Sequence, residues 1–235
     1  MSDKGSFANV NLEDPRQDVH RFRQEQIGLN RHCVAEELLP PNPAGLKILE
    51  IGGGAAEFSR RLQSLGIMVT FADLSPLNVE RARSFGMDAH QIDLNFGLPV
   101  FESDTFDGIV MLEIIEHVVA AENLLKEVRR VLKPQGFVIL STPNFAYWLN
   151  RIRILFGGLS HDEGYHYRFF TPSVLRQRIE QAGLTVARTA NTMPAVGYNL
   201  IANRWLGKPR RHIHVADSVS PLLAHTLIVK CVKNL

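Results

Sequence analysis

The chain has little of several features that mark particular classes of protein. Its 235 residues include only two cysteines, Cys33 and Cys231, which argues against a disulfide framework and favours a reducing compartment. The formal net charge of +2 is too small to indicate a nucleic-acid partner by itself. No run of about 18 apolar residues occurs, and the polar N-terminus lacks the apolar stretch of a secretory signal. We therefore expect a cytoplasmic protein without a transmembrane segment.

Strand and helix patterns alternate along most of the chain. This alternation is typical of an α/β fold in which a mostly parallel sheet carries helices on both faces. Apolar periodicity, with glycine and proline at the boundaries, defines each expected element. The expected strands cover 46–51, 67–73, 87–93, 105–112, 137–142, 184–191 and 225–233, and the expected helices cover 55–66, 75–86, 120–136 and 171–183.

Other segments precede or interrupt this alternation. Residues 1–44 are expected to form an N-terminal helical extension, with a disordered start and a helix over 17–39. Residues 45–235 are expected to form the main domain, with insertions at about 143–170 and 192–224. We expect the extension and the insertions to cap the functional edge of the sheet and to carry substrate specificity. The alternative is that they only decorate the surface.

The stretch LKILEIGGGAAEFSRRL, residues 46–62, carries the strongest functional signal. An apolar strand contains Glu50 near its end, and Gly52, Gly53 and Gly54 then lead into a helix. Three glycines indicate that a ligand comes very close to the backbone. A dinucleotide fingerprint would have a third spaced glycine where Glu57 stands, and the carboxylate of Glu50 would repel a pyrophosphate. The loop therefore favours a nucleotide-like ligand that carries positive charge.

Two further acids end the next two expected strands. Asp73 ends the second strand, where this kind of fold offers a carboxylate to ribose hydroxyls. Asp93 ends the third expected strand and can accept a hydrogen bond from an adenine amino group. Together with Glu50 and the glycines, these acids describe a site for an adenosine with a cationic tail. S-adenosylmethionine, with its ribose, adenine and sulfonium and no phosphate, matches that description.

These motifs together resemble those of the class I S-adenosylmethionine-dependent methyltransferases. LEIGGGAAEFSRRL resembles the family's E/D-x-G-x-G-x-G loop, FADLS its ribose motif and QIDLN its adenine motif, and the match runs from about residue 46 to residue 184. The resemblance implies a Rossmann-like, mostly parallel sheet with an antiparallel last strand. It implies methyl transfer to a small-molecule acceptor, with a hydroxyl oxygen as the expected atom. The implied cofactor-binding residues are Glu50, Gly52, Gly53, Gly54, Asp73, Leu74, Asp93, Leu94 and Leu112.

The glycine loop departs from the family at one position. Ala56 stands where the family has its last glycine. If the backbone there needs a positive φ, alanine would lower the affinity for the cofactor.

The stretch LEIIEHV holds a second group of polar residues, Glu113, Glu116 and His117. A helical turn after the fourth strand would point all three to one side. The stretch resembles the E-x-x-E-H element of ubiquinone-biosynthesis O-methyltransferases and of small-RNA 2′-O-methyltransferases. In the RNA enzymes a later histidine completes a metal site, and here that histidine would be His166.

The chemistry of this second group stays open between three interpretations. Two carboxylates and two imidazoles would accept Mn²⁺, Fe²⁺, Co²⁺ or Zn²⁺ as well as Mg²⁺. Alternatively, His117 and His166 act as catalytic bases without a metal. The third interpretation is that the residues only cap and pack.

Three further segments have open interpretations. SHDEGYHYRFF, with His161, Tyr165 and His166, is either a substrate-contacting loop or a packed connector. WLNRIRILFGG, residues 148–158, is either a lid helix or a surface for a lipid-like acceptor or a membrane. NRWLGKPRRHIH, residues 203–214, is basic and is either a solvated loop or a surface that attracts an acidic substrate or RNA, although it has no motif for stacking RNA bases.

Two rival functions belong to other classes. DLNFGLP and STPNFAYW resemble methionine-biosynthesis protein W, which motivates a non-catalytic, S-adenosylmethionine-binding regulatory partner. A nicotinamide-dependent oxidoreductase is disfavoured by the missing third glycine and by Glu50. The sequence identifies neither the acceptor nor the oligomeric state.

Overall fold

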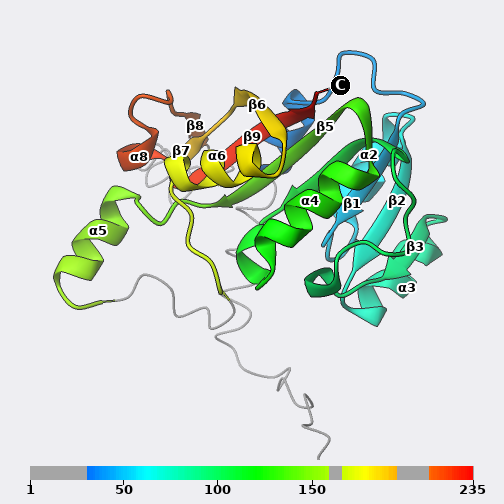
Figure 1. Ribbon diagram of the computed structural model, residues 1–235, viewed down its shortest axis with the longest axis horizontal. Coiled ribbons are helices and arrows are strands. Elements are labelled where there is room, and N and C mark those ends of the chain that lie inside the picture. The colour runs from blue at the N-terminus through cyan, green and yellow to red at the C-terminus, as the bar shows by residue number, and fades with distance from the viewer. Residues whose placement is uncertain (1–30, 159–165, 195–211, 235) are drawn as a thin grey trace, which may run out of the picture.

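The computed structural model describes residues 31–158, 166–194 and 212–234, and these residues form one nine-stranded sheet with surrounding helices (Figure 1). The strands lie in the order β3-β2-β1-β4-β5-β9-β7-β8, and β6 also pairs with β9. The strands are β1 Lys47–Ile51, β2 Met68–Asp73, β3 Asp88–Gln91, β4 Phe106–Leu112, β5 Leu132–Pro143, β6 Leu184–Thr189, β7 Thr192–Pro194, β8 His212–His214 and β9 Thr226–Lys233.

Six named helices and two short 3₁₀ turns accompany these strands in the described part of the chain. The helices are α2 Glu57–Ser64, α3 Pro76–Ser84, α4 Ala121–Val131, α5 Trp148–Leu155, α6 Pro172–Gln181 and α8 Ser220–Leu223. The 3₁₀ turns are η1 Leu94–Phe96 and η2 Ile115–His117. Residues 31–37 are also helical, and the rest of the helix expected over 17–39 lies mostly outside the described residues.

The pairing of the strands confirms the predicted class of sheet. β1 pairs in parallel with β2 and β4, β2 with β3, and β4 with β5. β9 runs antiparallel to β5 and to β6. The five parallel strands therefore point their carboxyl ends to the same edge, which is where open α/β sheets bind ligands.

Two apolar cores pack the sheet against its helices. One core includes Leu124 of α4 and Ile179 of α6, and these two helices lie on the same face of the sheet (Figure 1). The other core includes Phe58 of α2, Val79 of α3 and Val34 of the helical residues 31–37. The described end of the N-terminal extension thus packs on the body of the protein.

The helix expected over 120–136 is shorter in the structure. It ends at Val131, and the expectation that it continues to residue 136 is wrong. Leu132 instead begins β5 and pairs with Phe106, after which the register shifts. The physical reason is Pro134, because a proline and the residue before it both disfavour helical continuation.

The two expected insertions contain short regular elements. Residues 143–170 include α5, and residues 192–224 include β7, β8 and α8. β7 joins the sheet through the pair Thr192 and Thr226.

None of the described helices is long and apolar enough to cross a lipid bilayer. Both cysteines are free: Cys33 is exposed and Cys231 is buried.

The close approach of β4 and β5 at Gly108 gives a test of the packing. A Cβ atom at this position would overlap the ring of Phe137 on the neighbouring strand. We expect Gly108→Ala to lower the free energy of unfolding by about 1–3 kcal/mol, the usual cost of overpacking, as measured by urea denaturation. Adding Phe137→Leu should recover part of this loss, and strictly additive effects would contradict the proposed overlap.

Candidate active site

The glycine loop between β1 and α2 combines close packing with open space. Gly52 and Gly54 have φ values of +69° and +54°. A Cβ atom at Gly52 would overlap Ile114, and one at Gly53 would overlap the ring of Phe71. A Cβ atom at Gly54 would meet no described atom within 4 Å. The first two glycines therefore let the loop pack, and the third leaves its backbone open to a ligand.

Ala56 has the left-handed backbone for which glycine would be preferred. Its φ is 60°, it is buried, and it is the N-cap residue of α2 without a side-chain cap bond. A left-handed conformation costs a residue with a Cβ atom roughly 1–2 kcal/mol. Ala56 therefore has the positive φ at which alanine was predicted to lower the affinity for the cofactor.

Glu50 lies beneath this loop as a buried acid. Its Oε2 accepts a hydrogen bond from the Ser59 hydroxyl, and the residue is only 4% exposed. Burial raises the pKa of Glu50 to about 7, and the nearby charge of Asp73 also raises it, while the Ser59 bond lowers it. A positive charge placed beside Glu50 would favour its ionised form.

Asp73 fastens the glycine loop to the end of β2. Its Oδ2 accepts from the Gly54 N–H at 3.2 Å, and its Oδ1 accepts from the Ser75 N–H at 2.8 Å. An ionised carboxylate has about four acceptor positions, so both oxygens keep capacity for hydroxyl groups. Asp93 caps η1 by accepting from the Asn95 N–H at 2.9 Å.

The structure places the predicted cofactor residues along one edge of four adjacent strands. The order β3-β2-β1-β4 brings the loops after all four carboxyl ends next to one another. Leu74 is exposed, whereas Leu94 and Leu112 pack partly against the two cores. The groups at this edge are carboxylates, open backbone and apolar leucine side chains. Such a set of groups fits a cationic nucleoside.

Glu116, His117 and His166 come together at the same edge. One potential ligand atom from each lies within 4.8 Å of the others, and the two imidazole centroids are 4.6 Å apart. Glu116 is 2% exposed. Its Oε2 accepts from the Thr142 hydroxyl at 3.1 Å, whereas its buried Oε1 has no hydrogen-bond partner among the described residues. We call these three residues the Glu-His-His cluster.

The buried carboxyl group of Glu116 gives the cluster an affinity for a cation or a proton. Burial, together with the charge of Glu113, raises the pKa of Glu116. A buried carboxylate oxygen without a partner is costly, roughly 1–3 kcal/mol or more. A cavity of about 10 Å³ lies beside it, lined by Glu116, Thr142 and His166 among others. That volume suits one water-sized species.

Glu113 lies outside this cluster. The chain after β4 forms only the short turn η2, and Glu113 itself has a φ of +56°. Its Oε1 accepts from the Ser141 hydroxyl at 2.7 Å, and its Oε2 lies 3.6 Å from Nη1 of Arg31. The single helical turn that would have pointed all three predicted residues to one side does not form.

Backbone hydrogen bonds hold His166 in place beside Glu116. The carbonyl oxygen of Glu116 accepts from the N–H groups of Tyr167 at 2.9 Å and Arg168 at 3.2 Å. Sequence reasoning missed Thr142, Ser141 and Arg31 as partners of the two glutamates. A signal for Ser141 and Thr142 exists, because the motif STPN places two hydroxyls at the end of β5.

The aromatic and basic segments are only partly described. His161, Tyr165 and residues 203–211 lie outside the described residues. Helix α5 extends away from the sheet (Figure 1), and Leu155 and Phe156 are 79% and 83% exposed. The buried amide of Asn150 holds the base of this helix by donating to the Asn144 carbonyl.

A family model described as a methyltransferase domain matches residues 19–189. The chain belongs to this methyltransferase family. It is an S-adenosylmethionine-dependent methyltransferase, and the family implies S-adenosylmethionine as its cofactor.

Curated relatives agree with this assignment. The ubiquinone biosynthesis O-methyltransferase of Methylobacterium sp. (strain 4-46) is 27% identical over 206 residues, which cover 81% of each chain. The protein of the same name from Dinoroseobacter shibae is 30% identical over 190 residues, which cover 77% of this methyltransferase and 75% of the relative.

Solved structures share the fold at low sequence identity. A Thermotoga maritima S-adenosylmethionine-dependent methyltransferase, described as a possible histamine N-methyltransferase, has a TM-score of 0.68 at 20% identity and covers 93% of this chain and 96% of its own. A putative methyltransferase solved with the Haloferax volcanii activator Trm112 has a TM-score of 0.65 at 19% identity, with 94% and 95% covered.

The buried acid Glu50 predicts how stability changes with pH. Its folded pKa of about 7 lies above its ordinary value of 4.5, so the folded state holds the proton more tightly. Its contribution is therefore complete below about pH 4.5 and is lost as the pH rises through about 7. We expect Glu50→Gln to remove this loss. The free energy of unfolding of the variant, relative to that of the wild type, should therefore increase as the pH rises from 4.5 to 7.

Urea denaturation at several pH values measures this difference. Glu57→Gln, which changes an exposed acid in the first turn of α2, is the matched control. A constant difference between wild type and Glu50→Gln across this range would contradict the assignment.

Proposed function

We propose that this methyltransferase methylates a hydroxyl oxygen of a small-molecule acceptor and that the Glu-His-His cluster assists the transfer. The observation that carries the proposal is the buried Oε1 of Glu116, which lies beside two imidazoles and has no hydrogen-bond partner in the described part of the chain. The cluster lies at the sheet edge that also carries the glycine loop and Asp73. Relatives named ubiquinone biosynthesis O-methyltransferase support oxygen as the accepting atom.

The glycine loop and the strand-end acids would hold the cofactor. Asp73 would accept hydrogen bonds from the ribose hydroxyls, and Asp93 would accept one from the adenine amino group. Glu50 would favour the positive charge, and the open backbone at Gly54 would allow close approach. When bound, S-adenosylmethionine supplies a methyl group on a positively charged sulfur, which makes a good leaving group.

The two imidazoles of the cluster would take the proton from the acceptor hydroxyl. His117 or His166 would accept it as the oxygen becomes nucleophilic, and a positioned base typically contributes about 10²–10⁴-fold in rate. Glu116, whose other oxygen is held by Thr142, would orient the imidazoles and stabilise the charge that one of them gains.

Alternatively, the same cluster would hold a divalent cation, and its imidazoles would then be metal ligands instead of bases. Its three ligand atoms span less than 4.8 Å, and Oε1 of Glu116 is available for coordination. A bound cation would lower the pKa of the acceptor hydroxyl. This proposal uses Glu116, His117 and His166 but leaves out Glu113, because Glu113 is bonded to Ser141. A site with two imidazoles favours Mn²⁺, Fe²⁺, Co²⁺ or Zn²⁺ over Mg²⁺.

Helix α5 would give the enzyme peripheral contact with a membrane or a lipid-like acceptor. Trp148, Ile152 and Leu155 of this helix are exposed, and so is Phe156 directly after it. On a helical wheel of 100° per residue they share the face opposite the buried Asn150. The name of the relatives contains the word ubiquinone, which is a lipid-soluble quinone. A lipid-soluble acceptor would be reached from such a surface.

The cofactor site is tested by titrating S-adenosylhomocysteine into the protein in a calorimeter. We expect Asp73→Asn to weaken binding by about 10- to 100-fold, because charge-assisted hydrogen bonds contribute about 1.5–3 kcal/mol. The asparagine keeps the size of the side chain, but with one acceptor oxygen it keeps only one of the two bonds from the Gly54 and Ser75 N–H groups. Asp88→Asn changes an exposed carboxylate at the start of β3 and should leave the affinity unchanged. Equal affinity in Asp73→Asn and the wild type would disprove the proposed site.

The cluster is tested by metal binding and turnover. We expect Glu116→Gln and His166→Gln to abolish stoichiometric Mn²⁺ binding, measured by electron paramagnetic resonance, and Glu113→Gln to retain it.

His117→Gln should lower methyl transfer to a panel of phenols and catechols by about 10²-fold or more while S-adenosylhomocysteine affinity stays within a few-fold.

If the wild type binds no divalent cation and His117→Gln still loses turnover, the imidazoles act as bases without a metal. Full turnover in both histidine variants would contradict any catalytic role of the cluster.

A further inference from the structure

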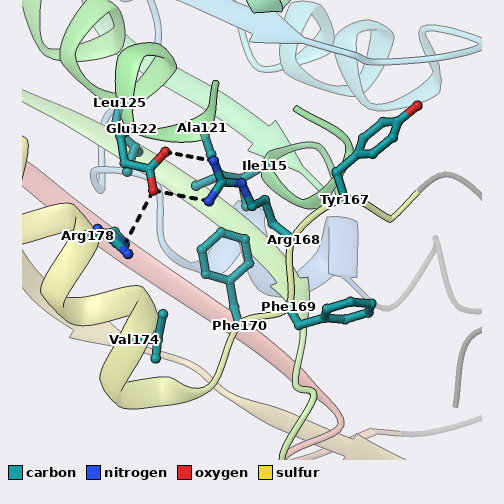
Figure 2. A pocket seen from close by; sticks show the side chains of 10 residues that line it. All are labelled: Ile115, Ala121, Glu122, Leu125, Tyr167, Arg168, Phe169, Phe170, Val174 and Arg178. Atoms are coloured by element: carbon teal, nitrogen blue, oxygen red, sulfur yellow. Dashed lines mark hydrogen bonds and ion pairs between the residues drawn. The ribbon is translucent and has the colours of Figure 1, made fainter. Parts of the chain in front are cut away.

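A second cavity lies behind the segment 166–170, which carries His166. It has a volume of about 240 Å³ and opens between the first turn of α4, the first turns of α6 and residues 167–170 (Figure 2). Arg168 and Phe169 line both this cavity and the small one beside Glu116, so they form the wall between them. The proposed methyl transfer uses no group that lies inside the larger cavity.

The charges at the mouth of this cavity are unequal. Figure 2 shows the carboxylate of Glu122 between the guanidinium groups of Arg168 and Arg178. The closest contacts are 3.3 Å to Arg168 and 3.6 Å to Arg178, longer than the 2.7–2.9 Å typical of strong charged hydrogen bonds. Two positive charges thus share one negative charge at loose distances, which leaves capacity for an anion.

The rest of the lining is apolar and includes an aromatic ring. Figure 2 shows the ring of Phe170 next to this ion-pair cluster, with Val174 on the neighbouring helix. Ile115 and Leu125 close the inner side, and both are fully buried. Ligand sites commonly have this character, with apolar walls and a few placed polar groups. The volume has room for one ring with a small substituent.

The wall of the cavity is tied to the Glu-His-His cluster. Tyr167 and Arg168 donate their N–H groups to the carbonyl oxygen of Glu116, and His166 directly precedes them. Arg168 also donates its Nη2 to the carbonyl of Val119 at 2.7 Å, two residues after His117. A ligand that moves residues 167–168 would therefore move the imidazole of His166.

We propose that this cavity binds a small ligand that joins an apolar ring to an anionic group, and that its binding shifts the position of His166. The anionic group pairs with Arg178 and Arg168, and the ring packs on Phe170 and Val174. The cavity lies on the other side of Arg168 and Phe169 from the small cavity beside Glu116, so a ligand bound there would give the methyltransferase a means of control by a third small molecule.

Phenyl phosphate is a suitable probe, because it combines one ring with a dianion. We expect saturable binding in a calorimeter, with at least fivefold lower affinity in Arg178→Met and unchanged affinity in Arg176→Met, an exposed arginine on the same helix. Inorganic phosphate and phenol should each bind more weakly than phenyl phosphate. The imidazole NMR signal of His166, assigned by its loss in His166→Gln, should shift on saturation.

Four outcomes would overturn the proposal. They are no binding to the wild type, equal binding to Arg178→Met, competition with S-adenosylhomocysteine, and a His166 signal that does not move. Binding of S-adenosylhomocysteine, measured on the same samples, reports on the cofactor site independently.

Discussion

The parallel pairing of β1 with β2 and β4 is the constraint on which the rest of the site depends. Its register sets Ile51 opposite both Ala72 and Met111, so three strands end level with one another. Acids that are far apart in the sequence then meet at one edge, and the loop after β1 must pass close between its neighbours. The tight packing at Gly52 and the bond from Gly54 to Asp73 both follow from that passage.

The same edge concentrates the costs of the fold. Ala56 and Glu113 are two of the four described non-glycine residues with positive φ, and both lie there. The acids Glu50 and Glu116 are buried there with raised pKa values. Backbone strain and buried ionisable groups persist only where the surroundings fix them, and the two apolar cores that pack the sheet against its helices supply that support. Such costs are typical of functional sites, which agrees with the proposed chemistry.

Much of this arrangement could be predicted because strand and helix periods are local properties. The strand-end positions of Glu50, Asp73 and Asp93 followed from the pattern, and the meeting of His166 with Glu116 and His117 followed from a family resemblance. The left-handed turn at Glu113 could not be predicted, since Glu113 is held by Ser141 of β5, which is distant in the sequence although β5 pairs with β4. The three-residue strands β7 and β8 were missed because so short a segment has no period and its pairing is non-local.

The place of β9 in the sheet also bears on how the protein is made. This strand is the last described element along the chain, yet it lies between β5 and β6. During synthesis the segments from β1 to β5 leave the ribosome first, and the open edge of β5 has no partner until β9 follows. An unpaired edge of this kind can join other chains. Newly made protein is therefore most prone to aggregate in the interval before residues 226–233 emerge.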